Sequence, residues 1–188
     1  MDLFELFKLS RTLRMKDGAI LLMDTPVNII PTDILCDLQK DLIDSVGVSQ
    51  AYKLFYESAK NGAIDYNKEF IKIHRLKDKR DIVEWQWKIV TLAGWGKWSV
   101  TSISNENILT ARFENSPFPR IYGNSNFPVD FIPAGFSAGG ISAAFNKNLE
   151  ALETKCMAMG DPFCEIVVGP PEFIEEKKQT LWHKWKLI

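Results

Sequence analysis

Two cysteines and a glutamate in the last third of the chain are the residues best suited to bind a metal ion. Cys156 and Cys164 flank a Gly-Asp-Pro turn at 160–162, so we expect them to face each other across a hairpin. Glu153 precedes the first cysteine by three residues. Zinc accepts both sulfur and carboxylate oxygen, whereas the hard ions Mg²⁺ and Ca²⁺ do not use thiolates. The residue types therefore favour a tetrahedral zinc site.

The same residues also allow a simpler interpretation. Cys156 and Cys164 could be half-buried strand residues, or could form a cross-strand disulfide. In an ideal strand, residues three apart point to opposite faces, so Glu153 and Cys156 can share a metal only across a bulge or a helical turn. Spacing alone leaves these alternatives open.

Composition restricts the class of protein. Of 188 residues, 46% are hydrophobic, and 23 basic against 24 acidic residues give a net charge of -1. This balance argues against binding to a nucleic-acid backbone. The longest apolar stretch, residues 19–30, contains Asp24 and Pro26, so we expect no membrane span. The acidic N-terminus lacks a secretory signal, and three cysteines are too few for a disulfide scaffold. We expect a soluble, cytoplasmic, single domain over residues 1–188.

Helices and a hairpin are expected over the first 114 residues. Asp17-Gly18 predicts a turn between two short strands within 11–30. Apolar residues at helical spacing predict helices over 32–46, over 49–73 with an interruption at Asn61-Gly62, and over 81–90. Alternation of period two then predicts strands over 97–103 and 108–114. Cys36 falls on the first helix and is expected to be a buried thiol.

The rest of the chain continues this alternation of helices and strands. We expect a Pro-rich loop at 116–119, a helix over 134–144, strands over 149–157 and 163–168, and a short helix in the tail over 172–188. Glycine, alanine and serine dominate 134–144, which lets a neighbouring backbone or a partner subunit approach closely. The order of elements predicts an α+β fold, a single domain whose mainly antiparallel sheet packs against helices.

Several short motifs resemble the 4-vinyl reductase domain. They are Gly-Phe-Ser-Ala-Gly at 135–139, Glu-x-x-Cys at 153–156, Gly-Asp-Pro-Phe-Cys at 160–164, Gly-Trp-Gly at 94–96 and Asn-Ser-Pro-Phe at 115–118. That family includes archaeal proteins described as predicted hydrocarbon-binding, a bacteriochlorophyll-biosynthesis protein and the sensor modules of phenol-responsive activators. The resemblance covers about 10–170, is strongest over 129–168, and leaves 171–188 as a C-terminal extension.

The resemblance implies a fold, an assembly and a set of metal ligands. The fold is the α+β ligand-binding fold of haem-type nitric oxide sensors and of a vesicle-tethering complex in Golgi transport, usually a homodimer. The phenol sensors bind zinc through three cysteines and a glutamate. Three of these ligands fall on Glu153, Cys156 and Cys164, and the remaining cysteine falls on Asp130. Aspartate can also bind zinc through oxygen, so the resemblance implies a structural zinc site with two sulfur and two oxygen ligands.

A small-molecule pocket is the other implication of the resemblance. Trp98, Phe113 and Phe136 fall on the elements that the family uses around its cavity, and we expect them to line an apolar pocket, although core packing is the simpler interpretation of each. Leu109 lies near the position where the phenol sensors carry a ligand-binding tryptophan, so phenol itself is not indicated.

Three functions remain open. The first is a non-catalytic homodimeric domain that binds an apolar or aromatic, hydrocarbon-like molecule and carries structural zinc. The second is a reductase or an accessory protein of tetrapyrrole metabolism, but the chain has no nicotinamide or flavin motif. The third is an interaction scaffold whose small-residue helix forms a subunit interface. We expect neither nucleic acid nor membrane as partner, and no residue is assigned a catalytic role.

Overall fold

The computed structural model describes residues 13–22 and 25–185. The chain divides into two compact units, Met1–Pro31 and Thr32–Ile188. The expectation of one domain over 1–188 stays a prediction. The beginning of the 10–170 core and the last residues of the 171–188 extension lie outside the described residues.

The first unit contains a small antiparallel sheet. Its strands are β1 (Leu13–Lys16), β2 (Ala19–Leu22) and β3 (Thr25–Val27), in that order. Asp17 and Gly18 have φ angles of 50° and 82°, the left-handed conformation that a two-residue hairpin turn requires. The predicted hairpin is confirmed. A third strand, which the sequence did not indicate separately, pairs with β2.

The second unit begins with α2 (Thr32–Val46), α3 (Val48–His74) and α4 (Lys79–Leu92). The predicted interruption at Asn61-Gly62 is wrong, because α3 passes through it without a break. A Cβ at Gly62 would meet no other atom, so this glycine marks an exposed helix position and not a turn. The predicted cap at Asp81 is also wrong: Asp78 caps α4 by accepting hydrogen bonds from the backbone N–H groups of Arg80 and Asp81.

A four-stranded antiparallel sheet follows. Its strands are β4 (Lys97–Ile103), β5 (Leu109–Glu114), β6 (Glu150–Lys155) and β7 (Cys164–Gly169), in the spatial order β4-β5-β7-β6. Both predicted hairpins are present. The prediction of an α+β fold with a mainly antiparallel sheet is confirmed.

The connections contain more helix than the sequence predicted. The expected loop at 116–119 is instead the start of α5 (Pro117–Tyr122), with Pro117 at the first helical position, where a missing N–H costs nothing. The small-residue helix α6 (Phe131–Phe145) begins three residues before the expected start. The tail forms α7 (Pro171–Lys184).

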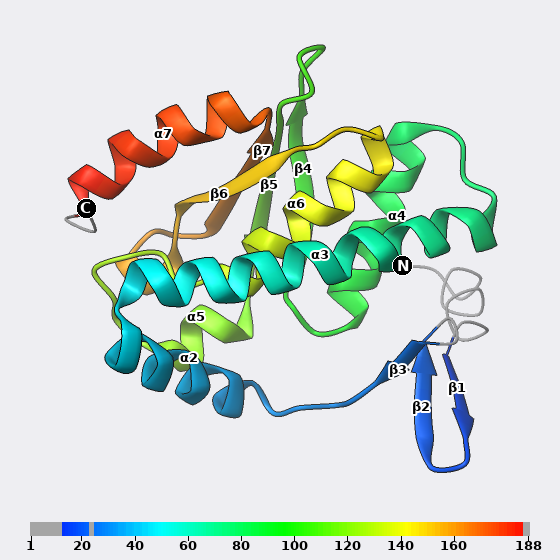
Figure 1. The fold of residues 1–188 in the computed structure, drawn as a ribbon, viewed down its shortest axis with the longest axis horizontal. Helices are drawn as coiled ribbons and strands as arrows, with labels where there is room; N and C mark the ends of the chain where they lie inside the picture. The colour runs from blue at the N-terminus through cyan, green and yellow to red at the C-terminus, as the bar shows by residue number, and fades with distance from the viewer. Residues whose placement is uncertain (1–12, 23–24, 186–188) are drawn as a thin grey trace. The chain divides into compact units, whose positions relative to one another are not determined.

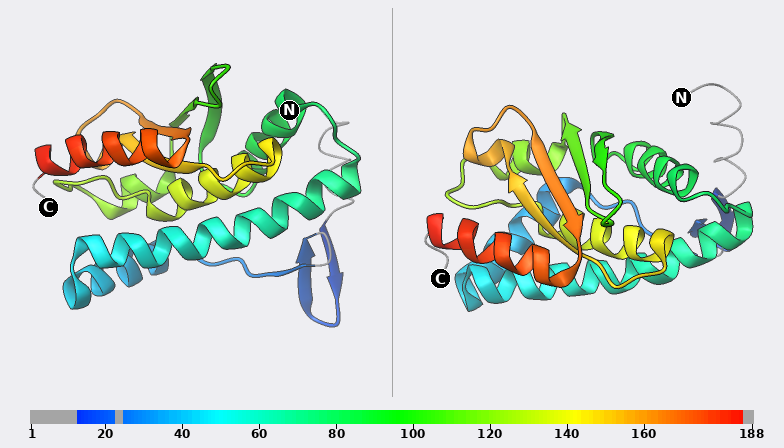
Figure 2. Two further views of the ribbon diagram at one scale, coloured as in Figure 1. Left: turned by 45° about the horizontal axis from the view of Figure 1, so that its top comes forward. Right: turned by 90° about the horizontal axis from the view of Figure 1, so that it is seen from above.

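The helices of the second unit form layers on the sheet. Helix α6 lies between α3 and the sheet, and α7 covers the opposite face (Figures 1 and 2). Alternation along β6 separates two cores: Leu152 packs with Val167 and Ile174 under α7, whereas Ala151 belongs to the core under α6. No helix among the described residues is long and apolar enough to cross a membrane.

The glycines of α6 serve the packing of α6 on α3. A Cβ on Gly135 would lie 2.2 Å from the carbonyl oxygen of Tyr56, and one on Gly139 would lie 2.2 Å from that of Lys60. Only glycine permits this approach. The neighbour that the small residues admit is therefore the backbone of this chain's own α3, so the scaffold hypothesis loses the surface on which it rested.

Candidate metal centre and adjoining cavities

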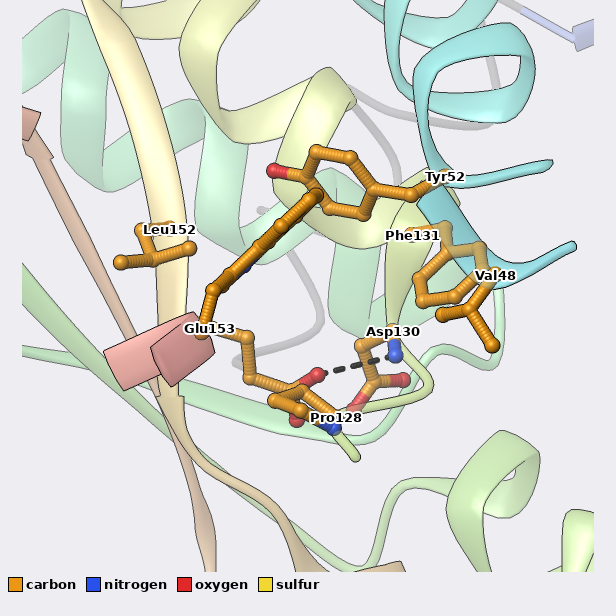
Figure 3. Close-up of a pocket in the computed structure, with 8 residues that line it drawn as sticks. Val48, Tyr52, Pro128, Asp130, Phe131, Leu152 and Glu153 are labelled. Carbon is orange, nitrogen blue, oxygen red and sulfur yellow. Dashed lines mark hydrogen bonds between the residues drawn. The ribbon is translucent and has the colours of Figure 1, made fainter. Parts of the chain in front are cut away.

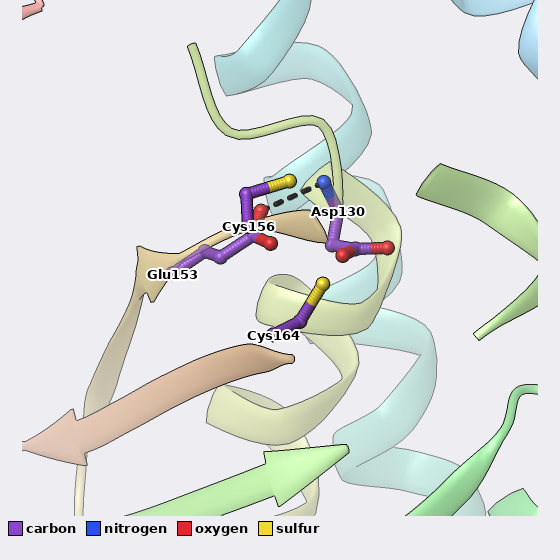
Figure 4. A group of neighbouring side chains, drawn as sticks. All are labelled: Asp130, Glu153, Cys156 and Cys164. Atoms are coloured by element: carbon purple, nitrogen blue, oxygen red, sulfur yellow. Dashed lines mark hydrogen bonds between the residues drawn. The ribbon is translucent and has the colours of Figure 1, made fainter. Parts of the chain in front are cut away.

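Four side chains from three segments meet at one point in the second unit. Asp130 directly precedes α6, Glu153 lies on β6, Cys156 follows β6, and Cys164 begins β7. One possible ligand atom from each lies within 4.8 Å of all the others, and all four residues are buried. Figure 4 shows the two sulfur atoms and the two carboxyl groups converging. We call these residues the four-residue cluster.

A bulge in β6 allows Glu153 and Cys156 to meet. Glu153 pairs with Ile166, but Lys155 pairs with Glu165, so β6 contains one residue more than β7 between these pairs. The extra residue, Thr154, shifts the alternation of faces by one position. The geometric requirement stated from the sequence, a bulge between Glu153 and Cys156, is met.

Backbone N–H groups are directed at the cluster. The N–H of Asp130 donates to Glu153 Oε2 at 2.9 Å, and that of Met157 donates to Cys164 Sγ at 3.2 Å. Asp161, in the turn between the cysteines, accepts from the N–H of Cys156 at 2.9 Å. These bonds stabilise negative charge on the cluster and fix the direction of its side chains.

The electrostatics of the cluster follow from burial and crowding. Burial raises the pKa of Asp130 to about 6. Burial, with the charge of Asp130 added, also raises the pKa of Glu153. The hydrogen bond between the two thiols lowers the pKa of Cys156 and raises that of Cys164. Four buried acids this close cannot all ionise unless a cation compensates them.

Unmade hydrogen bonds point to the same conclusion. Both carboxyl oxygens of Asp130 and Oε1 of Glu153 are buried without a well-formed hydrogen bond. Such atoms cost free energy unless a proton, a water or an ion satisfies them. Two thiolates and two carboxylates are a ligand set that zinc accepts. The residues present therefore fit a zinc ion, Asp130 included.

The predicted pocket residues divide into two groups. Trp98 and Phe113 come together, with ring centres 4.4 Å apart, and Trp87 stacks on Trp98 at 4.8 Å. Phe136 on α6 packs instead near Tyr66, at 6.3 Å. The indole Nε1 of Trp87 and the hydroxyl of Tyr66 are buried without a hydrogen-bond partner. The pocket assignment of Trp98, Phe113 and Phe136 stays a prediction.

A small cavity adjoins the four-residue cluster (Figure 3). Its volume is about 10 Å³, roughly the space that one water molecule needs. Asp130 and Glu153 form its polar wall. Its remaining wall is apolar or aromatic: Val48, Tyr52, Pro128, Phe131, Leu152 and Trp182.

A much larger groove lies between α3, the start of β6 and α7. Its volume is about 860 Å³, and Tyr52 and Trp182 line it as well as the small cavity. Sequence analysis did not assign Tyr52 to either site. The one hint was the placing of Tyr52 and Tyr56 one helical turn apart, which directs both rings to the same side of α3.

The other candidates have structural roles. Cys36 is buried and donates to the carbonyl oxygen of Phe118 at 3.6 Å, and burial raises its pKa to about 11. It is the buried thiol that the sequence predicted. Leu109 is fully buried at the start of β5.

Solved structures with the same fold include three of interest. The phenol-responsive sensory domain of the transcription activator PoxR, solved with phenol, has a TM-score of 0.81 at 24% identity, covering 95% of this chain and 94% of that one. A trafficking protein particle complex subunit 3 from Naegleria fowleri, covalently bound to palmitic acid, has a TM-score of 0.55 at 15% identity over 73% and 93%. A vinyl-4-reductase family protein from Methanocaldococcus jannaschii has a TM-score of 0.50 at 17% identity over 76% and 82%. At these identities the likeness shows the fold.

The sequence comparison locates the family more narrowly. No curated protein sequence matches this chain. The 4-vinyl reductase domain matches residues 109–170, a range that contains all four residues of the cluster and the region where the sequence resemblance is strongest. The resemblance is confirmed: residues 109–170 of this chain carry a 4-vinyl reductase domain.

Proposed function

We propose that this chain is a small-molecule-binding domain whose four-residue cluster holds a structural zinc ion. The observation that carries the metal assignment is the convergence of Asp130, Glu153, Cys156 and Cys164 within 4.8 Å in a buried site. Bound zinc would supply the positive charge that the carboxylates and thiols lack, and would tie the β6–β7 hairpin to the start of α6.

The zinc would act through the fold. Four protein ligands complete a tetrahedral shell, so a structural role is favoured over a catalytic one. Asp130 enters α6, and α6 packs closely on α3. The cluster therefore holds together the elements that surround the hydrophobic core under α6.

The ligand that we propose is an apolar or aromatic molecule. The sensory domain of PoxR was solved with phenol, and its fold matches 95% of this chain. In this chain the stacked rings of Trp87, Trp98 and Phe113 offer an aromatic wall, and the buried Nε1 of Trp87 offers a hydrogen-bond donor. One polar anchor on an aromatic wall is typical of a site for a small aromatic molecule. Phe136 completes the assignment on α6.

Native mass spectrometry of freshly purified protein tests metal, ligand and assembly together. The expected spectrum is a homodimer with one zinc ion per chain, and a further mass that organic solvent extracts as an apolar compound. Matched samples of C156S show whether the metal peak depends on the cluster. Wild-type protein without metal and without any extractable ligand after purification at neutral pH would contradict both parts of the proposal.

A further inference from the structure

We propose that Tyr52 and Trp182 control access to the four-residue cluster by separating it from the open groove. This inference rests on the proposed function, because it concerns how the metal enters and leaves its site. We call these two residues the aromatic pair.

The aromatic pair is the shared wall of two cavities. The small cavity and the groove have two lining residues in common, and these are Tyr52 and Trp182. On the inner side of the pair lie the carboxyl groups of Asp130 and Glu153. On the outer side lies a groove of about 860 Å³. Displacement of either ring would join the two spaces.

The two rings fit each other closely. Their centres are 5.2 Å apart, and their planes are nearly perpendicular, at 85°. This edge-to-face geometry is favourable for aromatic rings. Lys178, one turn before Trp182 on α7, places its ammonium group 4.3 Å from the centre of the indole and 5.6 Å from that of the Tyr52 ring. The lysine therefore holds the pair closed from the side of the groove.

The closed pair leaves no passage for an ion. The small cavity has room for about one water molecule, so a hydrated divalent cation cannot pass without movement of a ring. Trp182 is only 5% exposed, although it belongs to the last turn of a surface helix that ends at Lys184. Helix ends open locally at lower free energy than packed interiors. Trp182 is thus the ring expected to move, and Tyr52, in the long helix α3, stays fixed.

The groove has the charge that an entrance for a cation needs. Glu57, Glu172 and Glu175 line it, together with Glu150, which is paired with Lys60. Carboxylates at the mouth of a buried site raise the local concentration of cations. The aromatic pair thus lies between an acidic surface groove and two buried carboxyl groups.

The test measures access to Cys156 and Cys164 in metal-free protein, using iodoacetamide and peptide mass analysis for each cysteine. Trp182→Ala is expected to accelerate modification of these two cysteines by at least about tenfold, because truncating a buried ring opens a cavity. Cys36 is buried elsewhere and is the internal control, with an unchanged rate. Trp182→Phe restores an aromatic ring and is expected to restore slow modification.

Ile174→Ala is the matched control on the same helix. Ile174 is as buried as Trp182 and lines the groove, but it does not line the small cavity. If the aromatic pair controls access, I174A loses stability yet leaves the rates at Cys156 and Cys164 close to those of wild type. Equal acceleration in I174A and W182A, or acceleration of Cys36 as well, would show general loosening and overturn the proposal. So would an unchanged rate in W182A.

Zinc transfer to a coloured chelator gives the second readout. W182A is expected to release zinc at least about tenfold faster than I174A, with the same stoichiometry of bound zinc. The two proposals fail separately. A wild-type protein that binds no zinc contradicts the metal assignment, while the cysteine rates still decide the role of the pair. A protein that binds zinc and releases it equally fast in W182A and I174A contradicts the role of the pair alone.

Discussion

Glu153 and Cys156 direct their side chains at the same point although three residues separate them on and beyond an extended strand. The bulge at Thr154 makes this possible, because it inserts one residue into β6 opposite an unbroken β7. Without it, one of the two side chains would point toward α7 and the other toward α6. The metal site of this chain therefore depends on a local irregularity of the backbone as much as on the identity of its ligands.

Deletion of Thr154 tests this dependence. The deletion restores the regular pairing of β6 with β7 and turns Cys156 away from Glu153, so zinc affinity is expected to fall at least about 100-fold. Thr154→Ala keeps the length of the strand and is the control, with affinity within a few-fold of wild type. Competition with a zinc chelator measures both variants. Tight zinc binding by the deletion variant would show that the bulge is not required.

Asp130→Asn is expected to change the pH dependence of stability in the metal-free protein. Burial raises the pKa of Asp130 from 3.8 to about 6 in the folded chain. Because the folded state then holds its proton more tightly than the unfolded state, the stability due to Asp130 is present below about pH 4 and is lost as the pH rises through about 6. Asparagine carries no such proton and does not lose this term.

Melting curves of the two metal-free proteins measure this effect. At about pH 7.5, D130N is expected to melt several degrees above wild type, and the gap should close toward about pH 4. The hydrogen bond from the backbone N–H of residue 130 to Glu153 is retained in the variant. Added zinc should reverse the order at the higher pH, because only the carboxylate is a good ligand. A gap that does not change with pH would contradict the shifted pKa.

Two glycine-to-alanine variants test the packing of α3 on α6. A Cβ at Gly139 would lie 2.2 Å from the Lys60 carbonyl oxygen, so G139A must push the helices apart and is expected to cost about 1–3 kcal/mol or more. A Cβ at Gly62 meets nothing, so G62A should stabilise the protein by up to about 1 kcal/mol. Urea unfolding measures both. Similar effects of the two substitutions would contradict the close approach of the backbones.

Local patterns in the sequence were enough to predict most elements, and the differences have physical causes. Asn61-Gly62 suggested a break, but the packing of α3 on α6 holds the helix continuous through it. Pro117 suggested a loop, yet proline is as well suited to the first position of a helix. Propensity is local, and tertiary contacts decided each case.

The cluster was predictable and the cavities were not. Cys156, Cys164 and Glu153 lie within 12 residues of one another, so a hairpin brings them together, and the family resemblance supplied Asp130. Tyr52 and Trp182 are far apart in sequence, and only the position of α7 across the sheet brings their rings to 5.2 Å. No periodicity or motif contains that distance.

Trp87→Phe tests the proposed anchor for the ligand. Its Nε1 is buried without a partner, so losing it should change the free energy of unfolding of ligand-free protein little, by about 1 kcal/mol or less. Binding of acetophenone, which offers a carbonyl acceptor, is expected to weaken about tenfold, and binding of ethylbenzene, which offers none, should not change. Calorimetric titration of both compounds measures the difference. Equal losses for the two would indicate that Trp87 contributes shape and not a hydrogen bond.

The most direct test of the central claim is the zinc content of wild-type protein, purified without added metal, beside the variant with both Cys156 and Cys164 changed to serine. The expected result is one zinc ion per wild-type chain, none in the variant, and a melting temperature that a strong chelator lowers by several degrees in wild type only. Wild-type protein that contains no metal, and whose melting temperature neither zinc nor chelator changes, would contradict a structural zinc at Asp130, Glu153, Cys156 and Cys164.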